Sequence, residues 1–179
     1  MDTFRARTQM EFAIPARGLI GLRNRMLTAT RGEAVMHHRF HEYGEVRGEI
    51  TGRASGVMIA TDTGQVTSYA LDQLADRGAM FVEPGEMVYE GQIVGEHCKD
   101  NDIPVNAVKQ KRLTNMRQSV KDATVTLKPP RRMSLEAALE YIENDELVEL
   151  TPSSVRLRKR SLTDADRRRD ARRLSGVGT

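Results

Sequence analysis

In the stretch PGEMVYEGQIVGEH, residues 84–97, glycines separate short apolar runs at regular intervals. A second stretch of the same texture, GVMIATDTGQVTSYAL, occupies residues 56–71. Turn residues between short apolar runs are typical of an antiparallel sheet or a small barrel. We therefore predict a small, mainly antiparallel, β-barrel-like domain over residues 46–179, with one or two short helices. Within it, DTG at 62–64 is interpreted as a hairpin turn and residues 71–77, closed by Gly78, as a short helix.

Upstream of these runs the pattern changes. Residues 3–13 and 34–43 alternate apolar with polar side chains, which predicts two strands. Between them, apolar residues at helical spacing follow Pro15, and Gly32 is placed to end a helix. The order strand, helix, strand is that of a crossover βαβ unit. One helix on two strands leaves most of a sheet uncovered, so residues 1–45 form only part of a domain, and the whole chain is of the α+β class.

Two further helices are predicted towards the C-terminus. Ser134 is placed to cap a helix over 135–147 whose apolar stripe comprises Leu135, Ala138, Leu139 and Ile142. Thr163 is placed to cap a last helix in an Arg-rich tail, residues 161–179. Between the two helices, VRLRKR at 155–160 directs Val155 and Leu157 inward, with Arg156, Arg158 and Arg160 on the opposite face.

The formal net charge of +3 conceals an uneven distribution. Residues 109–121 carry a charge of +5 and residues 156–173 a charge of +6, so the rest of the chain is acidic. Two basic segments on an acidic body indicate a polyanion that is contacted locally, although charge runs are also common on simple solvated surfaces. The first segment lies in residues 99–122, a long basic loop without periodicity, which we expect to be mobile in the free protein.

The residues offer little for catalysis or metal binding. His37 and His41 lie about 13 Å apart on a strand that rises about 3.3 Å per residue, too far apart to share one ion, and His38 faces the other side. Cys98 is the single cysteine, and the chain has neither a phosphate-binding P-loop nor an apolar run long enough to cross a bilayer. We expect no catalytic residue, no metal site and no membrane contact in this segment.

The basic loop suits RNA. Its cations, amide and hydroxyl can contact phosphates and sugars. Aromatic residues make up only 4% of the chain and tryptophan is absent, which argues against a single-strand stacking platform. Structured RNA, which is recognised through shape, 2′-hydroxyls and phosphates, fits better than sequence-specific readout of DNA. The candidates in the loop are Lys109, Lys111, Arg112, Thr114, Asn115, Arg117 and Lys121.

Several stretches together closely resemble the C-terminal third of the translational GTPases known as BipA or TypA. They are PARGLIGLRNRMLTATRGEAVMHHRFHEY, DRGAMFVEPGEMVYEGQIVGEH, NDIPVN, KRLTNMR and RRMSLEAALEYIENDELVELTPSSVRLRKR, with the Arg-rich end. The first of these is also similar to the fifth domain of elongation factor G, whereas everything from about Val46 onward resembles a terminal domain peculiar to the family.

For residues 1–45 the resemblance implies part of a ferredoxin-like domain. Residues 3–13 and 34–43 would be parallel strands, and the strand between them would come from an earlier part of the chain. The chain would then begin inside a domain. The resemblance also implies that GTP and Mg²⁺ belong to a preceding GTP-binding domain, so this segment itself needs no cofactor.

The resemblance further implies ribosome binding. The family loop that points to the peptidyl transferase centre matches residues 100–121, so its basic residues would contact 23S ribosomal RNA and the acceptor end of A-site transfer RNA. A second set of candidates lies in the basic strand: Arg156, Arg158, Lys159 and Arg160. The expected protein is a cytoplasmic, monomeric factor in translation and large-subunit assembly under stress.

Two other interpretations stay open. In the first, the chain is a non-enzymatic interaction or assembly module whose basic tail docks on an acidic protein partner. Bound RNA after purification, with its sensitivity to nuclease, separates that reading from the leading one. In the second, the chain is an enzyme, which stoichiometric zinc or hydrolysis dependent on His38 or Ser55 would indicate.

Overall fold

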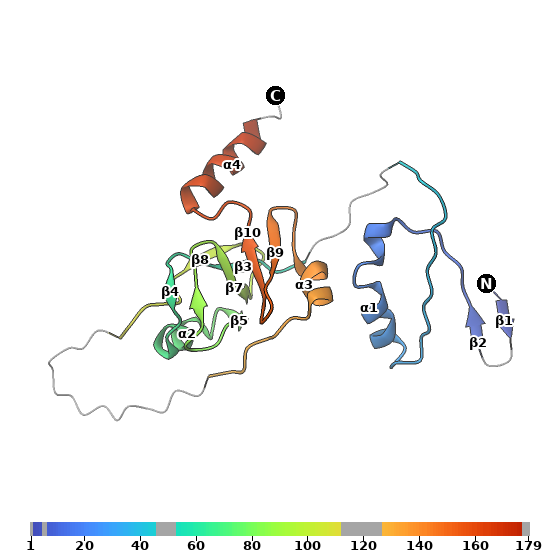
Figure 1. The fold of residues 1–179 in the computed structure, drawn as a ribbon, viewed down its shortest axis with the longest axis horizontal. Coiled ribbons are helices and arrows are strands. Elements are labelled where there is room, and N and C mark those ends of the chain that lie inside the picture. Colours follow the sequence, from blue (N-terminus) through green and yellow to red (C-terminus); the bar gives the residue numbers. More distant parts are fainter. Residues whose placement is uncertain (1, 5–6, 46–52, 112–126, 177–179) are drawn as a thin grey trace. The chain divides into compact units, whose positions relative to one another are not determined.

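The structure, a computed structural model, describes residues 2–4, 7–45, 53–111 and 127–176. The chain divides into two compact units, Met1–Thr51 and Gly52–Thr179. Each unit contains both helices and strands (Figure 1), and the predicted α+β class is confirmed.

The first unit begins with a hairpin. Strands β1 (Asp2–Phe4) and β2 (Arg7–Gln9) pair antiparallel, with Thr3 opposite Thr8. The prediction of one strand over 3–13 was therefore wrong, and residues 34–43 belong to no strand. An extended segment becomes a strand only when a neighbour accepts its hydrogen bonds. Among the described residues no strand lies between the two segments, and β1 and β2 satisfy each other locally.

The predicted helix of this unit is present. A 3₁₀ turn, η1 (Ala16–Leu19), precedes α1 (Leu22–Ala29). The helix ends in a Schellman arrangement, in which the Gly32 amide donates to the Leu27 carbonyl at 2.7 Å and the Arg31 amide to the Thr28 carbonyl at 3.3 Å. The stop predicted at Gly32 is confirmed, with Arg31 (φ 54°) taking the left-handed position just before it.

The second unit is built on a six-stranded sheet whose path runs β8-β3-β7-β10-β9, with β5 also paired to β7. The strands are β3 (Val57–Ala60), β5 (Gly78–Met80), β7 (Gln92–His97), β8 (Ile103–Val105), β9 (Glu146–Leu150) and β10 (Val155–Lys159). The pairs are antiparallel except β3 with β8. The mainly antiparallel prediction is confirmed, and the described strands form an open sheet.

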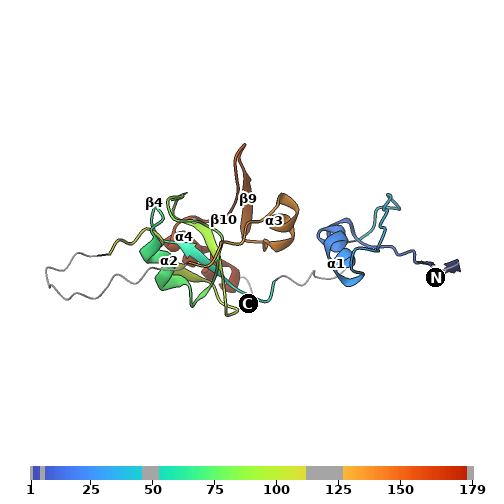
Figure 2. The ribbon, with the colours of Figure 1, turned by 90° about the horizontal axis from the view of Figure 1, so that it is seen from below.

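Both faces of this sheet are buried at β3. Alternation along β3 sends Met58 to one core, with Leu71 and Leu74 of helix α2 (Ser68–Leu74). Ile59 goes to a second core, with Ala138 and Tyr141 of helix α3 (Leu135–Tyr141). Figure 2 shows the sheet strands between α2 and α3. Burial on both sides explains why β3 is a continuous apolar run, VMIA, with every residue buried.

The DTG segment is not a hairpin turn. It leads from β3 into β4 (Gly64–Gln65), which pairs with β6 (Met87–Val88) in a separate two-stranded sheet. At residues 62–64 the chain therefore passes from one sheet to another instead of reversing direction within the same sheet. The short helix α2 exists as predicted but begins at Ser68, earlier than residue 71, because the Thr67 hydroxyl caps it by accepting from the Ala70 amide at 3.1 Å.

Towards the C-terminus both predicted caps are confirmed. Ser134 Oγ accepts from the Ala137 amide at 3.2 Å, and Thr163 Oγ1 from the Asp166 amide at 3.2 Å at the start of α4 (Asp164–Gly176). Helix α3 ends at Tyr141, however, and the predicted continuation to 147 becomes the turn into β9. Leu135 and Leu139 of the predicted stripe are 40% and 44% exposed, while Ala138 and Tyr141 face the core.

Candidate nucleic-acid interface

The base of the basic loop, residues 106–111, leaves the sheet at the end of β8. The predicted loop 99–122 is therefore ordered at its start, since residues 103–105 form β8 along β3 and Ala107 is buried in the α2 core. The absence of periodicity hid this strand, because three residues are too few to show alternation. Its parallel partner β3 is also distant in the sequence, so no local pattern indicates the pairing.

Two predicted RNA-binding residues lie on this base. Lys109 and Lys111 are both exposed. The ammonium of Lys109 donates to Gln73 Oε1 of α2 at 3.4 Å, and the Gln73 amide donates to the Tyr69 hydroxyl at 2.8 Å. Gln73 carries no charge, so its contact with Lys109 is not an ion pair.

The other loop candidates, Arg112, Thr114, Asn115, Arg117 and Lys121, lie outside the described residues, as does the segment whose mobility we predicted. Their roles stay predictions. The sequence shows that no Asp or Glu occurs from residue 103 to residue 121. The run of positive charge that begins at Lys109 therefore continues along the sequence to Lys121.

The arginine face of β10 is present but held by neighbours. Arg158 Nε lies 2.6 Å from Glu149 Oε1, and the Tyr89 hydroxyl donates to the other oxygen of Glu149 at 2.5 Å. Burial, together with this hydrogen bond, raises the pKa of Tyr89. Arg156 lies opposite Glu149 in the β9–β10 ladder. The guanidinium of Arg160 donates to the Asn144 carbonyl at 3.0 Å, with its side chain exposed.

Lys159 occupies a different environment from its neighbours. Its side chain is 3% exposed and its ammonium contacts three carboxylates: Asp102 at 2.6 Å, Asp145 at 2.8 Å and Glu146 at 2.9 Å. Lys159 therefore belongs to the protein interior and offers no surface for RNA. The sequence does contain a sign of this burial. Lys159 lies two residues after Leu157, so the two side chains share the inward face of the strand.

A second cation completes this ion cluster, which we define as Arg53, Asp102, Glu143, Asp145, Glu146 and Lys159. Arg53 forms a two-pronged pair with Glu146, at 2.5 Å and 2.6 Å, and its guanidinium lies 4.9 Å from the centre of the Tyr141 ring. Burial alone would raise the pKa of Glu146, but hydrogen bonds from Arg53 and Lys159 outweigh it and hold that pKa below its usual value.

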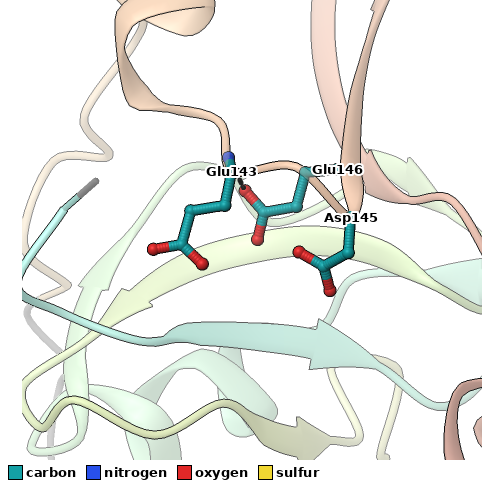
Figure 3. A group of neighbouring side chains, drawn as sticks. All are labelled: Glu143, Asp145 and Glu146. Atoms are coloured by element: carbon teal, nitrogen blue, oxygen red, sulfur yellow. Dashed lines mark hydrogen bonds between the residues drawn. The ribbon is translucent and has the colours of Figure 1, made fainter. Parts of the chain in front are cut away.

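Among the described residues, three carboxylates of this cluster lie close enough together to hold a metal ion. Ligand atoms of Glu143, Asp145 and Glu146 lie within 4.8 Å of one another, where α3 turns into β9 (Figure 3). Both oxygens of Glu146 already accept hydrogen bonds, from Arg53, from Lys159 and from the Glu143 amide at 3.1 Å. This arrangement is an internal ion cluster that joins residue 53 to the β9–β10 hairpin.

The histidines and the cysteine considered for metal binding or catalysis are exposed within their own units. His37, His38 and His41 are exposed in the first unit, and Cys98 is an exposed free thiol in the second. In α4, the first-turn acids pair with the next arginines, Asp164 with Arg168 at 2.7 Å and Asp166 with Arg169 at 3.2 Å. None of the helices among the described residues has the length and apolarity to span a membrane.

Comparison with known proteins gives two family matches. Residues 55–164 match the TypA/BipA C-terminal domain, and residues 1–54 match the elongation factor G C-terminus. Relatives named large ribosomal subunit assembly factor BipA are 49% identical in Escherichia coli strain K12, 46% in Bacillus subtilis strain 168 and 51% in Synechocystis. The matches cover 92%, 93% and 86% of this chain but 27%, 28% and 26% of those relatives, so the chain spans about a quarter of their length.

Proposed function

This chain belongs to the TypA/BipA family, as the C-terminal domain of a translational GTPase, and from that premise we propose that it is a ribosome-binding module that grips RNA of the large subunit through its basic loop. The observation that carries the proposal is the exposure of Lys109 and Lys111 at the foot of a segment with no carboxylate between residues 103 and 121.

The chemistry of the loop suits folded RNA. Ammonium groups act as point charges for phosphate, and the guanidinium forks of Arg112 and Arg117 can bind phosphate oxygens in pairs. Thr114 and Asn115 add donors and acceptors for sugars and base edges. On the family resemblance, the RNA is 23S ribosomal RNA together with the acceptor end of A-site transfer RNA. Lys121 extends the charged stretch, while Arg156, Arg158 and Arg160 form a second contact region.

The proposed role follows from the relatives, which are named large ribosomal subunit assembly factors. In this role the chain binds and orients, and GTP hydrolysis with its Mg²⁺ belongs to a separate domain of the whole protein. Such a factor acts as a monomer in the cytoplasm, in translation and subunit assembly under stress.

The test is binding to purified large ribosomal subunits by co-sedimentation over a range of salt concentrations. The variant Lys109→Gln/Lys111→Gln removes two loop charges. Its matched control, Arg77→Gln/Lys128→Gln, removes two exposed charges of the same unit outside residues 99–122. Each lost phosphate contact should reduce the slope of log affinity against log salt by about 0.7–0.9. We expect a weaker affinity and a flatter slope for the loop variant only.

Equal behaviour of the two double variants would overturn the proposal. The extended variant, with Arg112 and Arg117 also changed to Gln, must weaken binding further. If the chain instead binds ribosomes through an acidic protein, nuclease treatment of the purified complex leaves the interaction intact. That outcome also contradicts the RNA contact.

A further inference from the structure

We propose that Thr67 is a positioning residue for the basic loop. Its single hydroxyl joins the start of helix α2 to the backbone of Lys109, and so fixes the point from which the loop's cations leave the protein. The inference rests on the proposed function, because it concerns how that same RNA contact is oriented.

The hydroxyl of Thr67 serves two partners at once. Oγ1 donates to the Lys109 carbonyl at 2.6 Å and accepts from the Ala70 amide at 3.1 Å. A hydroxyl has one proton to donate and lone pairs to accept, so both bonds can form together. The backbone amide of Thr67 also donates to the Ala107 carbonyl at 3.2 Å. One residue therefore connects the helix to two points of the loop base.

The residues before Lys109 are fixed by packing. Ala107 is 1% exposed, and Val108 packs against the α2 core, close to Gly64, where an added Cβ would lie 3.3 Å from Val108 Cγ1. The Val108 amide donates to Asn106 Oδ1 at 3.0 Å. The next two residues, Lys109 and Gln110, are exposed. The Thr67 bond thus acts at the step where the chain passes from the packed core to the surface.

The side chain of Lys109 is oriented from the same helix. Its ammonium lies 3.4 Å from Gln73 Oε1, about 1.7 turns along α2 from the cap. The backbone and the side chain of Lys109 therefore both form hydrogen bonds with residues of α2 or its cap. This helix is anchored by Leu71 and Leu74, which are buried in the core. A cation placed in advance loses less conformational freedom when it meets a phosphate.

The test uses substitutions that separate tethering from helix capping. Thr67→Ala removes the tether and the cap, Thr67→Gly removes the tether while glycine remains an acceptable N-cap residue, and Thr67→Ser keeps both. Ser134 Oγ caps α3 by the same kind of bond, to the amide three residues on, so Ser134→Ala and Ser134→Gly report the loss of a cap in a different helix.

Two measurements on the 179-residue chain read the result. Backbone order parameters of Lys109 and Gln110 should fall in Thr67→Ala and Thr67→Gly and stay unchanged in Thr67→Ser and in both Ser134 variants. Affinity for purified large ribosomal subunits should fall about 2- to 10-fold, the effect of one lost hydrogen bond, with a flatter salt slope. A merely structural role would change neither the slope nor the loop order parameters.

The outcomes separate this inference from the proposed function. If Lys109→Gln/Lys111→Gln weakens binding while both tether-removing Thr67 variants bind like Thr67→Ser, the positioning role is wrong and the RNA contact stands. If the lysine variant itself binds normally, the proposed function fails first. In a background in which Lys109, Lys111, Arg112 and Arg117 are all changed to Gln, Thr67→Ala should have little further effect, and a full additional loss there would also overturn the inference.

Discussion

Arg53 and Glu146 lie 93 positions apart, and their guanidinium and carboxylate form two parallel hydrogen bonds inside the second unit. Glu146 is fully buried and also accepts from Lys159, its direct cross-strand partner in the β9–β10 ladder. This pairing attaches the start of the second unit to its last hairpin. The positive charges of Arg53 and Lys159 therefore stabilise the fold, whereas the side chains of Lys109 and Lys111 are exposed.

Replacement of Glu146 by Gln should lower the free energy of unfolding by about 3–5 kcal/mol, because it leaves two buried cations without their shared carboxylate. Glu143→Gln is the matched control, since Glu143 is 41% exposed and lies 3.8 Å from Arg53. That change should cost less than about 1 kcal/mol. Chemical denaturation followed by circular dichroism measures both, and equal effects would show that the cluster is not centred on Glu146.

The same carboxylate predicts a pH dependence. The folded-state pKa of Glu146 is lowered, so its contribution to stability is present above the unfolded pKa of about 4.3 and is lost as pH falls through the folded pKa. The difference in unfolding free energy between the wild type and Glu146→Gln should therefore be constant near neutral pH. It should shrink below about pH 4. A difference that stays constant down to pH 2 would contradict this assignment.

Gly78 lies where the neighbouring strand leaves no room for a side chain. A Cβ at this position would lie 1.8 Å from the Glu96 carbonyl oxygen on the paired strand β7, a backbone atom that has no rotamer by which to move away. Gly78→Ala should destabilise the protein by about 1–3 kcal/mol or more. Gly44→Ala has no atom within 4 Å of the new Cβ and should change stability by less than about 0.5 kcal/mol. Thermal unfolding of the two variants gives the comparison.

Local signals predicted the helices and caps well. Thr163 and Ser134 were identifiable as caps because an N-cap depends on residues within one turn. The end of α3 was not, because the fold places Glu146 at the start of β9, where it contacts Arg53 and Lys159 from distant parts of the chain. Long-range ion pairs of this kind leave no periodic trace in a sequence.

For the strands, too, local patterns were predictable from the sequence and long-range pairings were not. The runs around Ile59 and Ile93 predicted a sheet, but not that β7 would pair with β3, β5 and β10. The strand predicted over 34–43 lacks a partner among the described residues, so its alternation alone does not produce a ladder. For the candidate site, composition predicted the exposed Lys109 and Lys111, whereas the burial of Lys159 depended on three carboxylates from two other segments.

The most direct test of the central claim is tethered cleavage of ribosomal RNA from the loop base. Gln110→Cys in a Cys98→Ser background carries a single hydroxyl-radical probe between Lys109 and Lys111, and the native Cys98 provides the matched control position. With purified large subunits, we predict strong cuts in 23S ribosomal RNA from position 110 that disappear when Lys109 and Lys111 are changed to Gln. No cuts from position 110, under conditions in which the protein is bound, would contradict the account.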